Sequence, residues 1–283
     1  MKERVAHWII ERWKLFQGKE TGVPYTSQDY RMNQLRFCNV HRENDKVTRA
    51  LRATWMKPED NQDDLPLVGV LARRLNSVDA FYNLARPTEF TSDYLYSRIK
   101  NAAAAVNKNT IVNTAAYKVA GLMGNYDGAP DGLRTHSWAL SKLTQKTSDA
   151  WYTLAYERPK TLSEAHKQYM ALPGVGSFIG AQVVADLKHT KYLKDATDWW
   201  DWAAPGPGSL RGLNWYFDGD EKGKTNEKNF LERLHKMSSE VTPLISLDIP
   251  RINAQDWQNV MCEFDKYNRF YNMENTGKLY KSR

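Results

Sequence analysis

Cysteine is scarce in this sequence: Cys38 and Cys262 are the two among 283 residues. Two thiols are too few for a disulfide framework, a four-cysteine zinc site or a cysteine-ligated iron–sulfur cluster. The six histidines are dispersed, with no HExxH motif and no HxE motif paired with PCxxC, so the zinc protease and zinc deaminase patterns are excluded. We therefore expect neither a metal nor a cofactor.

Long apolar runs are also missing. The longest, residues 65–72, is interrupted by Pro66 and Gly69, and a membrane-spanning helix needs about 20 apolar residues. Residues 1–16 carry charges such as Glu3 and Arg12 where a signal peptide needs an unbroken apolar stretch. These absences predict a cytoplasmic protein without a membrane partner.

The remaining composition is typical of a folded protein. Hydrophobic residues make up 41% of the chain and charged residues 26%, which excludes intrinsic disorder and fibrous classes. The formal charge is +7, with 10 Trp and 15 Tyr. A basic, aromatic-rich surface suits phosphate neutralisation and base stacking, so composition is compatible with nucleic-acid binding without establishing it.

Apolar residues recur at helical spacing along most of the chain. The stripe Val5, Ile9, Trp13, Phe16 predicts an N-terminal helix, and further helices are expected at about 45–55, 67–75, 77–84, 93–106, 161–171, 177–187, 228–237 and 254–271. Alternation of period two is scarce. We predict a mainly α fold with two lobes, roughly 1–150 and 151–283. No linker marks the boundary between the two lobes, so its position is approximate. A single domain is the alternative.

The segment 161–187 has the pattern of a helix-hairpin-helix motif. Thr161 and Glu164 form a capping-box pair, and Leu172-Pro-Gly ends the helix that they begin. The glycines that follow permit close approach of the backbone, and the next helix places its free N–H groups beside them. We predict DNA phosphate binding without sequence preference by Gly174, Val175, Gly176 and Ser177. A plain tight turn between packed helices is the alternative.

The triplet Gly223-Lys224-Thr225 resembles the end of a phosphate-binding P-loop. The motif needs a glycine five residues before its second glycine, and that place is occupied by Asp218. A P-loop kinase is therefore not expected.

The hairpin also resembles that of helix-hairpin-helix DNA glycosylases, which implies a two-lobed helical fold. Those enzymes carry a catalytic Asp downstream of the hairpin leucine, and Asp195 and Asp198 bracket the matching place. Bifunctional members carry a lysine two residues past the last hairpin glycine, where this chain has Phe178. The resemblance therefore disfavours a Schiff-base lyase.

Three further segments extend the resemblance: 36–49, 205–214 and 258–267. Together with the hairpin they resemble the bacteriophage alpha-glutamyl/putrescinyl thymine pyrophosphorylase family, also called amino acid:DNA transferases. That glycosylase-like group is related to the helical domain of 5-hydroxymethyluracil DNA kinases. The resemblance spans about residues 30–270, although 50–160 carry little recognisable signal.

The resemblance implies a step in DNA hypermodification. A thymine-derived base in duplex DNA carries a pyrophosphorylated hydroxymethyl group at C5, and an amine displaces the pyrophosphate to form a C–N bond. The implied partners are double-stranded DNA carrying pyrophosphorylated hydroxymethyluracil, a small amine or amino acid, and a 5-hydroxymethyluracil DNA kinase. The implied location is the cytoplasm of an infected bacterial cell.

This chemistry needs cations for the leaving pyrophosphate and a base for the incoming ammonium. We assign substrate binding to cationic, amide and glycine residues of the three segments: Arg36, Asn39, Arg42, Arg49, Gly206, Gly208, Arg211, Gln258 and Lys266. We assign acid–base chemistry to Asp198, Glu263 and Asp265. Structural alternatives stay open, namely a solvated helix face for the first arginines, a surface turn at Gly206–Gly212 and an ion pair for Glu263. Covalent catalysis by a cysteine is not expected, because free cysteines usually pack as small apolar groups.

Two other functions compete with the transferase. One is a base-excision glycosylase, in which Asp198 would activate water or stabilise an oxocarbenium ion. The other is a non-enzymatic DNA-binding protein that presents DNA to a kinase.

Overall fold

A computed structural model describes residues 1–108 and 136–275. The predicted mainly α fold is confirmed, because the described residues form helices and loops with no strand among them. None of these helices combines the length and apolar character that a membrane crossing needs.

The chain divides into two compact units. Unit 1 comprises Met1–Asp45 and Trp200–Arg283, and unit 2 comprises Lys46–Trp199. The chain therefore passes between units near residues 45 and 199, whereas the sequence had suggested a change of lobe near residue 150. The physical reason is that the first helix packs against the last two, and such a long-range contact leaves no local mark in composition.

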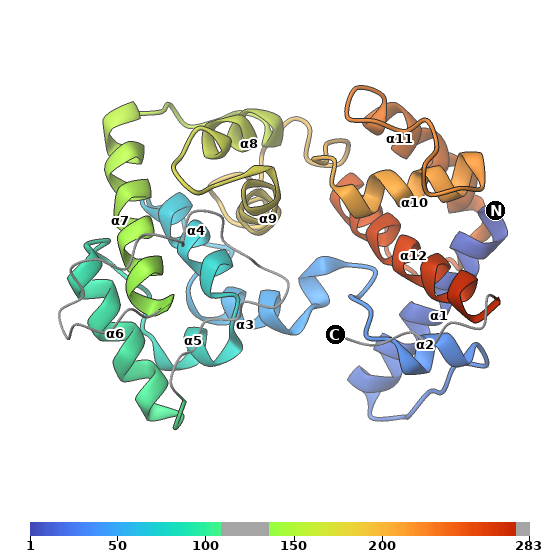
Figure 1. Cartoon of the computed structure of the whole chain (residues 1–283), viewed down its shortest axis with the longest axis horizontal. Coiled ribbons are helices and arrows are strands. Elements are labelled where there is room, and N and C mark those ends of the chain that lie inside the picture. The colour runs from blue at the N-terminus through green and yellow to red at the C-terminus, as the bar shows by residue number, and fades with distance from the viewer. Residues whose placement is uncertain (109–135, 276–283) are drawn as a thin grey trace. The chain divides into compact units, whose positions relative to one another are not determined.

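Unit 1 is an α-helical bundle built from both ends of the chain (Figure 1). Its elements are α1 (Lys2–Thr21), α2 (Tyr30–Gln34), the 3-10 helix η1 (Arg42–Asn44), α10 (Pro207–Asp218), α11 (Phe230–Val241), the 3-10 helix η2 (Thr242–Leu244) and α12 (Ala254–Asn275). The core joins Trp8 and Ile9 of α1 to Phe230 of α11 and Phe264 of α12, all fully buried. The apolar stripe predicted for residues 5–16 therefore packs against α11 and α12, helices from the C-terminal part of the chain.

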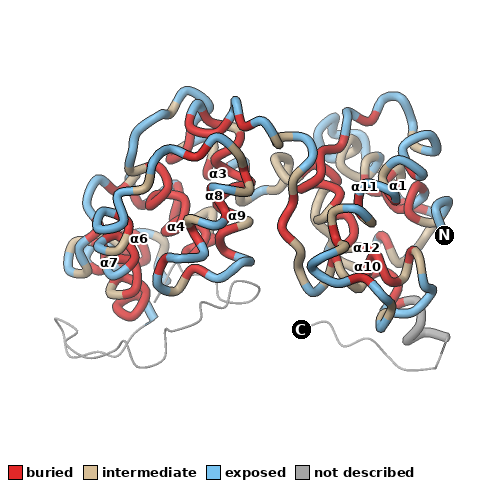
Figure 2. Tube along the Cα trace, turned by 90° about the horizontal axis from the view of Figure 1, so that it is seen from above, coloured by how far each residue is buried: buried red, intermediate tan, exposed pale blue. Residues whose placement is uncertain are grey.

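Helix α4 forms the centre of unit 2, and all of its residues are buried (Figure 2). Its helices are α3 (Lys46–Thr54), α4 (Leu65–Leu75), α5 (Val78–Asn83), α6 (Ser92–Ala105), α7 (His136–Leu154), α8 (Leu162–Met170) and α9 (Ser177–Leu187). Helix α4 packs against α7 and α9, and α8 packs against α9. The pair α8–α9 is the predicted hairpin, so α4 lies directly behind it.

Helix α7 was not expected from the sequence. Its buried face carries hydroxyl residues, including Ser141, Thr144 and Thr147. Each of these three hydroxyls donates to the carbonyl four residues earlier at 2.8 Å. The bond satisfies the polar atom within the helix, so a stripe that reads as polar in the sequence can be buried.

Helix α10 occupies the stretch 206–212, for which the sequence had left a surface turn open. Pro207 occupies the first helical turn, where its missing N–H costs nothing. The side of α10 that carries Gly208 and Gly212 lies against α12, and a Cβ on Gly212 would overlap the Met261 backbone carbonyl. The glycines therefore serve close helix packing rather than a loop conformation.

We expect Gly212→Ala to destabilise the protein by about 1–3 kcal/mol, the usual cost of overpacking. The added methyl meets backbone, which cannot rotate away as a side chain can. Thermal or urea unfolding measures the effect. Gly176→Ala is the control, since a Cβ there meets no atom within 4 Å, and equal stability of the two variants would contradict the packing role.

Candidate functional site

Three segments of unit 1 meet in one polar cluster, which we define as Cys38, Asn39, Arg42, Ser209, Gln258, Cys262, Glu263 and Lys266. These are residues of the same segments that carried the family resemblance. Direct contacts join the segment before η1 to the middle of α12, and α12 to the first turn of α10. The cluster therefore rests on tertiary packing within unit 1.

The segment 36–45 is not the helix face that its spacing suggested. The Asn39 N–H donates to Asp45 Oδ1 at 2.8 Å, and Asn39 Nδ2 donates to the Asn44 carbonyl at 2.9 Å. Such side-chain bonds compete with a helical backbone, and only the short η1 forms before α3 begins at Lys46. Arg36 is exposed, and Arg42 is half-buried.

Arg12 of α1 fixes this segment and was missed by sequence reasoning. Its guanidinium donates to the carbonyls of Phe37 (3.2 Å) and Cys38 (3.1 Å) and to Asn39 Oδ1 (3.1 Å). Burial lowers the pKa of Arg12, while the nearby Asp45 acts in the opposite direction. A signal was present, because Arg12 lies four residues after Trp8 and three after Ile9, on the apolar face of the helix.

Helix α12 supplies the acidic and basic side of the polar cluster. Glu263 Oε2 accepts from the Cys38 N–H at 3.3 Å and lies 3.5 Å from Lys266 Nζ. Lys266 also donates to the Arg36 carbonyl. At the start of the helix, Asp256 accepts from the Arg42 N–H at 3.0 Å. Glu263 is 15% exposed, so its carboxylate combines a cationic neighbour with limited access to solvent.

The first turn of α10 completes the polar cluster. Gln258 Nε2 lies 3.3 Å from both Ser209 Oγ and Cys262 Sγ. A Cβ on Gly208 would come within 3.2 Å of Cys262 Sγ, and one on Gly206 within 3.3 Å of Gln258 Nε2. Gly206, Gly208 and Gln258 are thus brought together at a helix N-terminus, which favours an anion.

Neither cysteine is set up as a nucleophile. Burial, followed by repulsion from Glu263, raises the pKa of Cys262 to about 12 and that of Cys38 well above its usual range. The guanidinium of Arg42 acts weakly in the opposite direction on both thiols, which places it within electrostatic reach of them. Both thiols stay protonated at neutral pH, as expected for packing residues.

Asp265 and Arg211 form a structural pair instead of joining the polar cluster. Asp265 is fully buried and accepts from Arg211 at 2.9 and 3.0 Å and from Trp215 Nε1 at 3.2 Å. Arg269 lies 3.2 Å from the same carboxylate. A carboxylate with this many partners and no solvent access is poorly placed to take a proton from a substrate.

Arg49 and Asp198 belong to unit 2, as the hairpin residues do, whereas the remaining predicted residues belong to unit 1. Arg49 is exposed on α3. Asp198 accepts from the backbone N–H groups of Leu162 (2.6 Å) and Ser163 (3.1 Å), the first two residues of α8. Its carboxylate therefore caps α8 alongside the predicted capping box of Thr161 and Glu164, which is present.

The predicted hairpin joins α8 to α9 through residues 171–176. Gly174 has φ +67° and packs against Leu143, so its role is conformational. Val175 is buried, whereas Gly176 and Ser177 are exposed at the start of α9. His166 Nε2 lies 3.0 Å from the Ser177 carbonyl, which ties the two helices together. Exposed N–H groups at Gly176 and Ser177 are the part of the hairpin that can meet a phosphate.

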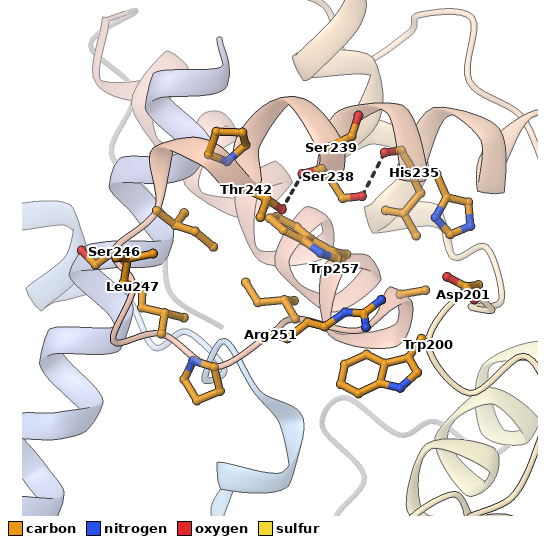
Figure 3. A pocket seen from close by; sticks show the side chains of 17 residues that line it. Trp200, Asp201, His235, Ser238, Ser239, Thr242, Ser246, Leu247, Arg251 and Trp257 are labelled. Carbon is orange, nitrogen blue, oxygen red and sulfur yellow. Dashed lines mark hydrogen bonds between the residues drawn. The ribbon is translucent and has the colours of Figure 1, made fainter.

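A hollow of about 540 Å³ in unit 1 was not foreseen, and none of the predicted residues lines it. At one end the Arg251 guanidinium lies 4.2 Å from the centre of the Trp200 ring, near Asp201, and Leu247 lies at the other end (Figure 3). Hydroxyls of Ser238 and Thr242 bond back to helix carbonyls. A guanidinium stacked on an indole offers a flat cationic face, suited to an aromatic or anionic group.

We expect Asp198→Ala to lower the free energy of unfolding by about 0.5–2 kcal/mol, the usual value of a helix N-cap. The substitution leaves two N–H groups of α8 without their carboxylate. Asp195→Ala is the matched control, because that carboxylate is exposed and pairs with Lys194 alone. Equal melting temperatures for the two variants would refute the capping role.

Comparison with known proteins gives one match. A family model described as "5-hmdU DNA kinase, helical domain" matches residues 1–277. No curated protein matches the chain, and no solved structure does. Since the family model spans nearly all of the sequence, the chain belongs to the family of 5-hmdU DNA kinase helical domains.

Proposed function

We propose that this protein is a DNA-modifying transferase that acts on a 5-hydroxymethyluracil-derived base. It replaces pyrophosphate on the C5 methylene with an amine or amino acid. The observation that carries the proposal is the polar cluster of unit 1, where cationic residues, a helix N-terminus and a half-buried carboxylate meet. Membership of a family named for 5-hmdU DNA supports the choice of base.

The reaction divides naturally among the residues of the polar cluster. The amine nitrogen donates its lone pair to the methylene carbon while the C–O bond breaks, and pyrophosphate leaves with that electron pair. Arg42 and Lys266 stabilise the leaving oxyanion together with Arg36, which lies outside the polar cluster and whose carbonyl accepts from Lys266. This role suits guanidinium forks and an ammonium. Glu263 takes the proton that the incoming ammonium must lose. The glycosidic bond takes no part.

Duplex DNA binds through the hairpin of unit 2. Gly176 and Ser177 start α9, and their exposed N–H groups carry the positive end of the helix dipole. Space beside Gly176 is open, so a phosphate can approach the backbone. Contacts of this kind carry no base information, and the target base is read elsewhere.

A second candidate function is that of a non-enzymatic DNA-binding protein that presents DNA to a kinase. It is favoured by the engagement of Asp198 as a helix cap and of the buried Asp265 in an ion pair with Arg211. Asp198 would also be the key carboxylate of a glycosylase, so its capping role weakens that alternative. The transferase requires neither residue to act as a base.

We expect Glu263→Gln to lower the rate of transfer by about a hundredfold, the scale of general-base catalysis. The assay combines duplex DNA bearing pyrophosphorylated hydroxymethyluracil with a panel of amines and amino acids, followed by nucleoside mass spectrometry. The rising limb of the pH–rate profile should disappear together with the carboxylate. Glu232→Gln, an exposed change on α11, is the matched control.

The same assay separates the competing functions. Transfer by the wild type with an unchanged rate in Glu263→Gln rejects the assignment of the base. Abasic sites in the product indicate a glycosylase. Binding of the substrate without any product identifies the non-enzymatic partner.

We expect Gly176→Val to weaken duplex binding about tenfold, because a branched side chain blocks one charge-assisted phosphate contact. Fluorescence anisotropy at several salt concentrations measures this, and wild-type affinity should fall steeply with salt and vary little with sequence. A thermal melt checks the fold, which should be unaffected at this open position. Unchanged affinity of the variant would show that DNA does not contact the hairpin.

A further inference from the structure

The hairpin has no basic side chain of its own. Residues 171–178 read Ala-Leu-Pro-Gly-Val-Gly-Ser-Phe, so the hairpin itself offers a phosphate backbone N–H groups, one hydroxyl and a helix dipole, but no charged side chain. Such a terminus carries about half an elementary charge. A full positive charge lies directly behind it, on α4.

That charge belongs to Arg74, which is fully buried. Its guanidinium donates to the hydroxyls of Thr144 (3.1 Å) and Thr147 (2.8 Å) of α7 and to the Pro173 carbonyl (3.0 Å) in the hairpin. The Thr147 hydroxyl lies 2.9 Å from the same carbonyl. Arg74 thus holds the turn that precedes Gly174 and Gly176.

Arg74 also has no counter-charge among the described residues. Its hydrogen-bond partners are two hydroxyls and a carbonyl, all neutral. Burial lowers its pKa to about 9, which leaves it charged at neutral pH. The preceding residue is the contrast: Arg73 is equally buried and pairs with Asp186 of α9 through two hydrogen bonds. Burying an arginine without a partner carboxylate costs folding free energy. An anion bound at the hairpin would offset part of that cost.

We propose that Arg74 is a positioning residue for DNA: its buried charge makes the hairpin an anion site that takes a backbone phosphate. The inference rests on the DNA-binding part of the proposed function. The guanidinium holds the Pro173 carbonyl from inside the protein, and the exposed residues Gly176 and Ser177 follow at the start of α9. A phosphate outside then supplies the counter-charge that the interior lacks.

The test adds a counter-charge inside the protein while keeping Arg74. Thr144→Asp places a carboxylate of similar size next to the guanidinium, and Thr144→Asn is its uncharged match. Thr147→Val removes a hydroxyl that touches Pro173 without changing any charge. Duplex affinity is measured by anisotropy, and the melting temperature is measured for each variant.

Thr144→Asp is expected to bind duplex DNA about tenfold more weakly than Thr144→Asn, which is the scale for charges roughly 10 Å apart in an effective dielectric of about 20. It should melt no lower than Thr144→Asn, because the buried charge gains a partner. A merely structural role for Arg74 predicts the same affinity for both, and that result overturns the proposal. Arg74→Met is the second variant, and wild-type affinity there also overturns it.

Gly176→Val separates the contact of DNA with the hairpin from the role of Arg74. If Gly176→Val weakens binding and the charge variants do not, DNA contacts the hairpin and the role of Arg74 alone is rejected. If wild-type protein shows no salt-dependent duplex binding, both the DNA contact and the role of Arg74 fall together.

Discussion

The close approach of α10 to α12 is the packing constraint on which the candidate site depends. Gly212 lets the α10 backbone lie against the Met261 carbonyl, and Gly208 lets the first turn lie against Cys262. This contact sets Gln258 beside Ser209 and the first turn of α10 against Cys262, the residue before Glu263. A larger residue at either glycine would separate the helices and disperse the polar cluster.

Buried arginines organise both units, and their partners decide what each one does. Arg12 has carbonyl and amide oxygens to hold, and it shapes the segment before η1. Arg73 has the carboxylate of Asp186 and is fully neutralised within unit 2. Arg74 has hydroxyls and one carbonyl, so its charge is left to act on what lies outside the hairpin. Arginine is suited to all three places because its charge persists when buried.

Only some of the polar residues that the sequence singled out are placed to take part in the candidate chemistry. The fully buried carboxylate of Asp265 is paired with the partly exposed Arg211, and Asp198 completes the cap of α8. Glu263 is left as the carboxylate with both a cationic neighbour and a path to solvent. A single base is sufficient for displacement by an amine, because the leaving pyrophosphate needs charge stabilisation more than it needs a proton.

The sequence by itself determined the helical class, most helix positions, the capping box at Thr161 and Glu164, and the hairpin, because each depends on residues within about four positions of one another. It also singled out most members of the polar cluster. Only the tertiary structure decided that α1 joins the last helices, that Gly206–Gly212 begin a helix, and that Asp198 and Asp265 are engaged. The tertiary structure likewise decided the roles of Arg12 and Arg74, although the place of Arg12 on the apolar face of its helix already marked it as buried. Their roles depend on partners far away in the chain, and neither periodicity nor spacing records which distant group a buried charge will meet.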